Sequence, residues 1–513
     1  MLRNLTNTRR LISIAITLAR EDALFIFRDL EISPTITSIA KLFSRRSDKA
    51  KGKRLAAALE RLGPTFIKLG QTLSTRSDLI GDEAAEDLSR LRDNLPPFPT
   101  AIARSIIEEE LGDKIDTLFS EFNDTPIAAA SIAQVHKATT KDGKQVAVKI
   151  LRPDIEKAFE RDLDFFSWIA EIMEQRLSRA DRLKPREIVR TFRESVFFEL
   201  DLRFEAAAAK ELADNIKHHE PGFRVPTIDW NLTSRRVLTA EWIDGIALND
   251  VAAIKAAGHD TDALLTKASQ SLFSQVFVDG FFHADLHPGN LFVDKNGDLV
   301  AVDFGIMGRL DWNSRVYMAE ILRGFLTQDY KHVAEMHFKA GYVPSDKSKE
   351  AFTQACMAVA QPIIGKPLNE ISVAKLLGQM FKIAAEFEME TQPQLLLLQK
   401  TMMVTEGVGR MLNPNLNMWE LSRPLIEKWA NDSFGPQAKL REATKEGAEL
   451  LRKLPEMAGY VESTLKMLGS GQGLKLHPDS IRALEKQRRQ HQQQWQLMGV
   501  LGLILLTMIW LGQ

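Results

Sequence analysis

The segment HADLHPGNLFVDKNGDLVAVDFG, residues 283–305, constrains this chain more than any other stretch. It joins a polar loop to a short apolar strand pair, and it places three oxygen-bearing side chains at fixed intervals: Asp285, Asn290 and Asp303. Hard divalent cations such as Mg²⁺ prefer carboxylate and amide oxygens as ligands. The segment therefore predicts a rigid turn that holds a cation and the negative charge it neutralises.

Two simpler interpretations of the loop compete with this one. His283 and His287 stand four residues apart, as zinc ligands can, but the Pro-Gly pair that follows His287 breaks any helix that would align them. No cysteine lies nearby, because the single cysteine is Cys356, for which we predict a buried thiol in a reducing compartment. An ordinary polar turn would account for residues 283–290 alone, but not for the DFG sequence that follows.

The spacing of the three oxygen ligands is similar to that of protein kinases. In a kinase, an H-x-D loop carries the catalytic Asp, an Asn five residues later binds magnesium, and a DFG sequence supplies the second metal-binding carboxylate. Asp285, Asn290 and Asp303 fit these three places. A kinase also needs a phosphate-binding lysine on a strand, and VAVK ends at Lys149, after a hairpin turn predicted at residues 142–143.

A kinase lysine of this kind pairs with a glutamate from a later helix. The stretch FFELDLRFEAAAAK offers Glu199 and Glu205. We favour Glu205 as the partner of Lys149, with Glu199 and Asp201 available for a different contact. On sequence alone, both glutamates stay candidates for the pair.

The nucleotide-covering loop departs from the kinase pattern. Kinases carry glycines there, which let backbone amides approach phosphate, whereas alanine restricts the backbone. In this chain the loop is rich in alanine instead of glycine, and no A-P-E sequence follows the DFG. The candidate nucleotide-contacting positions of this loop are Ile127, Ala128, Ala129, Ala130, Ser131, Ile132, Ala133, Gln134 and Val135.

A further motif precedes the loop by some sixty residues. Lys68 and Gln71, in the sequence KLGQ, lie three apart on a predicted helix and so share one face. Together, K-x-G-Q, the alanine-rich loop, VAVK, E-x-D at residues 199–201, HADLHPGN and DFG resemble the UbiB family of atypical kinase-like proteins. The resemblance covers roughly residues 55–310, and its specificity comes from the combination of motifs.

The resemblance implies roles for these residues. Asp285 would accept the proton, Asn290 and Asp303 would bind Mg²⁺, and the VAVK lysine would bind the phosphates of ATP. Lys68 and Gln71 would belong to a helical extension that folds over the nucleotide and contacts the E-x-D pair. Family members support ubiquinone biosynthesis at the inner membrane, through ATPase or small-molecule kinase-like activity.

The fold class expected is α+β: a bilobal protein-kinase-like fold with an N-terminal helical extension and a C-terminal membrane helix. Because 513 residues exceed one compact core, several units are expected. We predict a helical extension over 1–118, a kinase-like N-lobe over 119–245, a helical C-lobe over 246–430, a helical linker over 431–495 and a membrane anchor over 496–512.

The anchor is predicted from an uncharged run at residues 497–511. At ~1.5 Å per residue it spans roughly 22 Å, less than the ~30 Å hydrocarbon core, so a buried or oligomer-forming helix is the alternative. Bacterial members of the resembled family commonly carry two membrane segments, and this chain has one apolar run. Basic and acidic residues nearly cancel, 67 against 68, which predicts no nucleic-acid partner.

The sequence therefore predicts a membrane-anchored, ATP- and Mg²⁺-dependent atypical kinase or ATPase that promotes ubiquinone biosynthesis. We expect it on the bacterial inner membrane, with the catalytic region on the cytoplasmic side. Its expected partners are membrane lipid or quinone precursors and other ubiquinone biosynthesis proteins. Two alternatives stay open: a non-catalytic, nucleotide-gated scaffold of a quinone biosynthesis complex, and a small-molecule phosphotransferase of the aminoglycoside or choline type.

Overall fold

The computed structural model describes most of the first 413 residues of the chain. The described residues are 2–24, 50–74, 84, 87–88, 91, 95–176, 185–217, 222–362, 379, 382–384, 386–389, 393–413, 421, 424 and 429. Two compact units are present, Met1–Ala430 and Asn431–Gln513. The predicted linker over 431–495 and anchor over 496–512 lie outside the described residues, so the fold below is that of the first unit. The predicted domain boundaries within it stay predictions.

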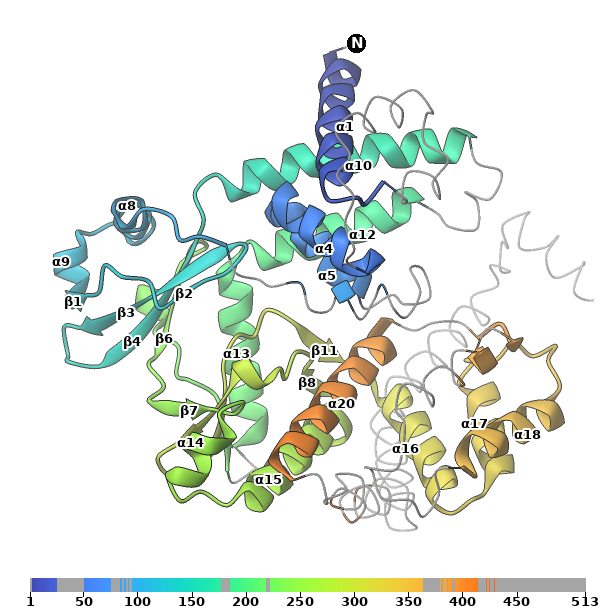
Figure 1. Ribbon diagram of the computed structural model, residues 1–513. Helices are drawn as coiled ribbons and strands as arrows, with labels where there is room; N and C mark the ends of the chain where they lie inside the picture. Colours follow the sequence, from blue (N-terminus) through green and yellow to red (C-terminus); the bar gives the residue numbers. More distant parts are fainter. Residues whose placement is uncertain are drawn as a thin grey trace, which may run out of the picture. The chain divides into compact units, whose positions relative to one another are not determined.

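A five-stranded antiparallel sheet forms the smaller lobe (Figure 1). The central β3 and β4 turn at Gly143, whose φ of 81° lies in the left-handed region that glycine favours, and this confirms the predicted hairpin. Buried Val148 and Ile150 alternate with outward residues along β4, as expected for a strand with one face on a core. The strands are β1 (Phe119–Phe122), β2 (Ala128–Ala129), β3 (Ala133–Thr140), β4 (Gln145–Leu151) and β6 (Val237–Glu241).

Helices surround this sheet. Short α8 (Thr100–Leu111) and α9 (Ile115–Leu118) precede it and pack on the face that carries Val148. Three longer helices follow β4: α10 (Ile155–Arg176), α12 (Pro185–Glu199) and α13 (Leu202–Ile216). The N-terminal helices pack against α10 in a separate apolar core, and they are α1 (Leu2–Arg20), α4 (Lys51–Leu62) and α5 (Pro64–Ser74).

The second lobe is mainly helical and contains two small sheets. In the larger one the strand order is β5-β10-β9-β7, and in the smaller one β8 pairs antiparallel with β11. The strands are β5 (Phe223–Arg224), β7 (Gly245–Ala247), β8 (Phe281–His283), β9 (Leu291–Asp294), β10 (Leu299–Ala301) and β11 (Met307–Arg309). The helices are α14 (Val251–Ala256), α15 (Thr261–Phe273), α16 (Trp312–Leu326), α17 (Tyr330–Lys339), α18 (Lys349–Ala360) and α20 (Pro393–Leu412).

One predicted strand is not continuous. The sequence suggests two strands between Phe223 and Gly245, the first ending near Trp230 and the second running to Trp242. Instead of the first, the two-residue β5 joins the other sheet, parallel to β10, and Ile228 alone forms an antiparallel bridge with Ala240 of β6. Pro226 lacks the N–H that a ladder needs, and Asp229 caps a single 3₁₀ turn that begins at Trp230. The second strand of that pair, β6, is confirmed.

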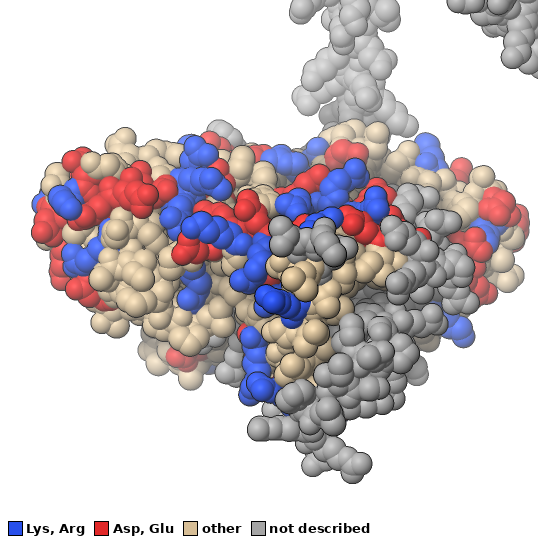
Figure 2. All heavy atoms as spheres, turned by 90° about the horizontal axis from the view of Figure 1, so that it is seen from above, with Lys and Arg blue, Asp and Glu red and all other residues tan. Residues whose placement is uncertain are grey.

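The surface and the helix lengths bear on the membrane expectation. None of the helices that the structure describes combines the length and apolarity needed to cross a membrane. On the face seen in Figure 2, acidic and basic side chains lie interspersed, in line with the balanced net charge.

Cys356 is buried, as predicted, and burial raises the pKa of its thiol to about 12.

Candidate active site

An ion pair between the small sheet and α13 forms one wall of the site. Lys149 lies on β4, and its Nζ donates to Glu205 at 2.8 Å from Oε1 and 3.0 Å from Oε2. Both side chains are largely buried. Burial alone would lower the pKa of Lys149, but the carboxylates of Asp303 and Glu205 outweigh it, so the pKa lies above its ordinary value. Of the two glutamates considered, Glu205 is the one that pairs with this lysine.

Asp303 enters the same site from the second lobe. It follows β10, and its φ of 65° turns the chain sharply, a conformation that non-glycine residues seldom adopt. Its Oδ1 lies 3.5 Å from Lys149 Nζ and accepts a hydrogen bond from the N–H of Gly305 at 3.2 Å. The Lys149 ammonium lowers the pKa of Asp303 to about 2, and Lys68 contributes a smaller effect of the same sign. A carboxylate that is ionised at neutral pH therefore stands beside the lysine.

Backbone hydrogen bonds hold the polar loop next to Asp303. The Ala284 N–H donates to the Ile306 carbonyl at 3.0 Å, which continues the pairing of β8 with β11. The Val302 N–H donates to the Asn290 carbonyl at 2.9 Å. Within the loop, Asn290 Nδ2 donates to the carbonyl of Asp285 at 3.2 Å. The three oxygen-bearing residues are thus tied to one another through the main chain of two antiparallel segments.

The two histidines of the loop brace its backbone. His283 Nδ1 accepts from the Asp285 N–H at 3.1 Å, and His287 Nδ1 accepts from the Gly289 N–H at 3.2 Å. Burial lowers the pKa of His283, so its ring is neutral at physiological pH. Within the described part of the chain, no group of three His, Cys, Asp or Glu side chains is arranged to hold a metal ion. The loop therefore gives no support to a zinc cluster.

The site offers the ligand set that a nucleotide-bound Mg²⁺ uses. Magnesium is usually held by one or two protein oxygens, with phosphates and water completing its shell, so a three-ligand protein cluster is not required. The amide nitrogen of Asn290 donates to the Asp285 carbonyl, and its amide oxygen Oδ1 is the atom of this side chain that could bind a cation. Asp303 supplies an exposed carboxylate. Asn290 and Asp303 fit the cation on these grounds.

Lys68 on α5 reaches the E-x-D segment. Its Nζ lies 2.7 Å from Glu199 Oε2, at the end of α12, and both side chains are mostly buried. Asp201 instead caps α13, where its carboxylate accepts from the N–H and the guanidinium of Arg203. Gln71 lies one turn after Lys68, and its side chain makes no hydrogen bond to Glu199 or Asp201. The expected contact with the E-x-D pair is therefore present for Lys68 but not for Gln71.

The alanine-rich loop is a tight, pinned turn. Ala130 donates its N–H to the Ala133 carbonyl at 2.7 Å and accepts from Arg152 Nε and Nη2, at 3.0 and 2.8 Å. Arg152 also donates to the Pro96 carbonyl at 3.0 Å, which ties the loop to the segment before α8. Ala128 and Ala129 pair with Val135 and Gln134 on β3, Ile127 is exposed, and Ser131, Ile132 and Ala133 are buried.

Gln134, one of the predicted nucleotide-contacting residues, has its side chain in the interior. Gln134 is fully buried, and its Oε1 accepts from the Phe98 N–H at 3.0 Å. Its Nε2 lies 2.8 Å from His136 Nε2. The side chain therefore joins the strand to the preceding segment, and any nucleotide contact at this position would come from the main chain.

Most of the chain is similar to known kinase-like proteins. Residues 90–337 match the ABC1 atypical kinase-like domain, and residues 356–417 match the UbiB helical domain. A probable protein kinase UbiB from Marinobacter nauticus is 40% identical, over 89% of this chain and 84% of its own. One from Shewanella woodyi is 39% identical, over 92% of this chain and 86% of its own. The chain belongs to the UbiB family.

A solved structure of similar fold agrees with this assignment. The complex of Rv3197 with erythromycin, from Mycobacterium tuberculosis, is similar at a TM-score of 0.51 and 26% identity, covering 72% of this chain and 93% of that one. The mixed helical and sheet architecture expected for a kinase-like fold is therefore confirmed. The C-terminal membrane helix, which lies outside the described residues, stays a prediction.

The UbiB helical domain contributes a residue that the sequence reasoning missed. Lys400 lies on α20, and its Nζ donates to Asp285 Oδ1 at 3.0 Å. The lysine and the carboxylate are 115 residues apart, and Lys400 stands in the stretch LLLLQKTMM, where nothing marks it as functional. Its position beside Asp285 depends on how α20 packs, and no motif in the chain encodes that packing.

Proposed function

We propose that this UbiB-family chain binds Mg-ATP and catalyses ATP hydrolysis or phosphoryl transfer in support of ubiquinone biosynthesis. The observation that carries the proposal is the approach of Lys149 to Asp303, which joins the two lobes at 3.5 Å although the residues are 154 apart. Kinase-type phosphoryl transfer needs a phosphate-binding lysine and a metal-binding carboxylate in one cleft. The curated relatives, named probable protein kinase UbiB, agree with this reaction class.

The residues divide the work of the reaction as follows. Lys149, oriented by Glu205, binds the non-transferred phosphates. Asn290 and Asp303 would hold Mg²⁺, which would supply positive charge to neutralise the triphosphate. Asp285 accepts the proton of the attacking hydroxyl or water while the new P–O bond forms. The bond between the γ-phosphorus and the bridging oxygen breaks, and its electron pair leaves with ADP.

Measurements of ATP turnover and of nucleotide binding in two carboxylate variants test this proposal. With Mg-ATP, Asp285→Asn is expected to lower ATP turnover by about 10²- to 10⁴-fold while nucleotide affinity and the circular dichroism spectrum are kept. Asp303→Asn is expected to weaken Mg-dependent nucleotide binding itself. Full turnover in Asp285→Asn would refute the role of this carboxylate.

The predicted apolar run at the C-terminus bears on where the chain acts. We propose that residues 496–512 anchor the chain in the bacterial inner membrane, with the two lobes on the cytoplasmic side and membrane quinone precursors or lipids as the molecules acted on. Fractionation of the full chain and of a chain ending at residue 495 tests the anchor. Recovery of both chains in the soluble fraction would contradict it.

A nucleotide-gated scaffold is the second candidate function, and one contact favours it. Asp285 is engaged by Lys400 in an ion pair, which a scaffold could keep through its nucleotide cycle. Quinone content in a quinone-deficient bacterial strain discriminates the two candidates. Restoration by Asp285→Asn would favour the scaffold, and failure of a stable, nucleotide-binding Asp285→Asn would favour the enzyme.

A further inference from the structure

The ion pair between Lys400 and Asp285 connects the UbiB helical domain to the proposed reaction centre. Nζ of Lys400 lies 3.0 Å from Oδ1 of Asp285, and the two side chains are 31% and 32% exposed. They are therefore neither sealed in the core nor fully solvated. A ligand that enters beside Asp285 can reach the ammonium.

Packing sets the position of Lys400 on α20. The buried residues of this helix recur at intervals of three and four, so they form one stripe, and they are Leu398, Thr401, Thr405, Val408 and Leu412. The helix contacts α15 and β11, and β11 pairs with the strand that leads into the polar loop (Figure 1). Lys400 adjoins this stripe, so its stem is held at the loop by a packed helix.

The other cations near the centre are already committed. Lys149 is held by Glu205 and Asp303, and Lys68 is paired with Glu199. The segment 285–290, DLHPGN, contains no lysine or arginine. Arg309, which follows the DFG sequence, forms a bidentate pair with Glu211 on α13. Among these basic residues, Lys400 is the one in contact with the proposed proton acceptor.

A cation in this position has a definite task in phosphoryl transfer. Negative charge on the equatorial oxygens of the γ-phosphoryl group must be balanced while it passes to an acceptor positioned by Asp285. An ammonium that hydrogen-bonds one oxygen of that carboxylate leaves the other oxygen for the acceptor. Lysine carries three donors, so it can keep the Asp285 contact and donate to a phosphoryl oxygen as well.

We propose that Lys400 is a catalytic residue that contacts the transferred γ-phosphoryl group and is delivered to the site by the UbiB helical domain. This inference rests on the proposed function. It adds that the helical domain completes the active site, because the loop at residues 285–290 carries no lysine or arginine of its own beside Asp285. The ammonium keeps its proton throughout; Asp285 takes the acceptor proton, and the electron pair of the broken P–O bond leaves with ADP.

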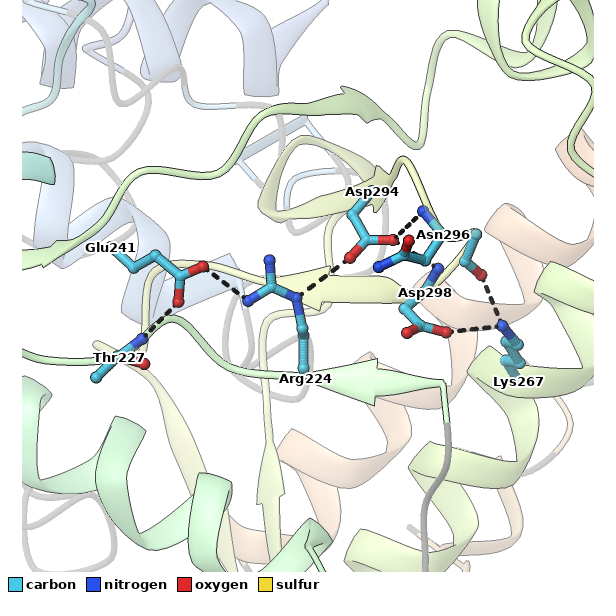
Figure 3. A network of polar contacts seen from close by, with 8 residues as sticks. Arg224, Thr227, Glu241, Lys267, Asp294, Asn296 and Asp298 are labelled. Atoms are coloured by element: carbon cyan, nitrogen blue, oxygen red, sulfur yellow. Dashed lines mark hydrogen bonds and ion pairs between the residues drawn. The ribbon is translucent and has the colours of Figure 1, made fainter. Parts of the chain in front are cut away.

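A matched control exists in the same lobe. Lys267 on α15 pairs with Asp298 at 3.0 Å, and the two side chains are 30% and 35% exposed. Figure 3 shows this pair at the end of a polar network that includes Arg224 and Asp294. Lys400→Met and Lys267→Met therefore remove ion pairs of equal length and similar exposure, one at the proposed centre and one on the β9–β10 turn.

The experiment measures the affinities of the full chain for Mg-ATP and Mg-ADP, together with ATP turnover. Lys400→Met is expected to weaken ATP binding about tenfold relative to ADP, which lacks the γ-phosphoryl group, and to lower turnover about 10²-fold. Lys400→Arg is expected to restore part of both effects. Lys267→Met is expected to leave the ATP-to-ADP affinity ratio and the turnover unchanged.

The results for Lys400→Met test the inference, and nucleotide binding by the wild-type chain tests the proposed function. An unchanged affinity ratio and turnover in Lys400→Met would reduce the contact to a structural ion pair and overturn the inference. A rise in turnover would identify Lys400 as an inhibitory lock, which also overturns it. Absence of nucleotide binding in the wild-type chain would refute the proposed function, and the inference with it. If Lys400→Met does not fold, Lys400→Gln, which keeps a donor for Asp285 without the charge, takes its place.

Discussion

Lys149 on β4 and Glu205 on α13 form a largely buried ion pair in which one ammonium contacts both carboxylate oxygens, at 2.8 and 3.0 Å. The pair fixes α13 against the small sheet. Because Lys149 also lies 3.5 Å from Asp303, the same ammonium spans the two lobes. The arrangement links the stability of the fold to the proposed chemistry.

Removal of Lys149 is expected to destabilise the protein, because it leaves Glu205 buried without its partner. Lys149→Met should lower the free energy of unfolding by about 3 to 5 kcal/mol, as measured by urea denaturation. The double variant with Glu205→Gln should regain part of this loss, because no buried charge is then left unpaired. A double variant whose loss equals the sum of the two single losses would show that the pair is not coupled.

Asp303 is expected to stay ionised far into the acid range. Its pKa of about 2 lies below the usual value of ~3.9, so this carboxylate contributes stability that is present above pH ~4 and is lost as the pH falls from ~4 toward 2. Carbon-13 NMR of the side-chain carboxyl should show no titration between pH 5 and 3, with the signal identified by its loss in Asp303→Asn. In Lys149→Met the same signal should titrate at higher pH. An unshifted titration in that variant would contradict the attribution to Lys149.

Arg152 is expected to control the mobility of the alanine-rich loop. It donates two hydrogen bonds to the Ala130 carbonyl and one each to the carbonyls of Pro96 and Leu95, so Arg152→Ala removes the side-chain ties between the turn and the segment before α8. Hydrogen exchange of the amides in 128–133 should become faster, as followed by mass spectrometry. Arg104→Ala is the control, because Arg104 pairs with Asp124 in the same lobe and this pair lies outside residues 128–133. Equal exchange in both variants would show that the loop is held by its backbone alone.

Asp294 is expected to contribute more stability than the lysine at the end of its network (Figure 3). Its Oδ1 accepts from the N–H groups of Asn296 and Asp298, and its Oδ2 accepts from Arg224 Nε at 3.3 Å. Asp294→Ala removes the acceptor of two N–H groups on the β9–β10 turn and of Arg224 on β5, and should cost about 3 kcal/mol. Lys267→Met removes a half-exposed pair and should cost roughly 1 kcal/mol or less. Thermal or urea unfolding checks the order, and equal losses would contradict it.

Short-range spacing made much of the site predictable. The intervals between Asp285, Asn290 and Asp303 are set within one loop and one strand pair, where local backbone geometry fixes which side chains meet. The hairpin before Lys149 follows from an Asp-Gly turn between alternating apolar residues in the same way. The strand expected to end near Trp230 is reduced to β5 and a single bridge at Ile228, because Pro226 and the capping Asp229 interrupt it.

By itself, the sequence determined the kinase-like family of the chain, because residue type and local spacing in several motifs are together specific to that family. Only the tertiary structure decided which glutamate pairs with Lys149. Glu199, at the end of α12, pairs with Lys68. Asp201 caps the next helix, α13, and this helix places Glu205 beside Lys149 on the sheet. It also decided the approach of Lys400 to Asp285. Contacts between residues more than fifty positions apart depend on how helices pack over buried apolar stripes, and many sequences share such stripes whatever charged residue stands beside them.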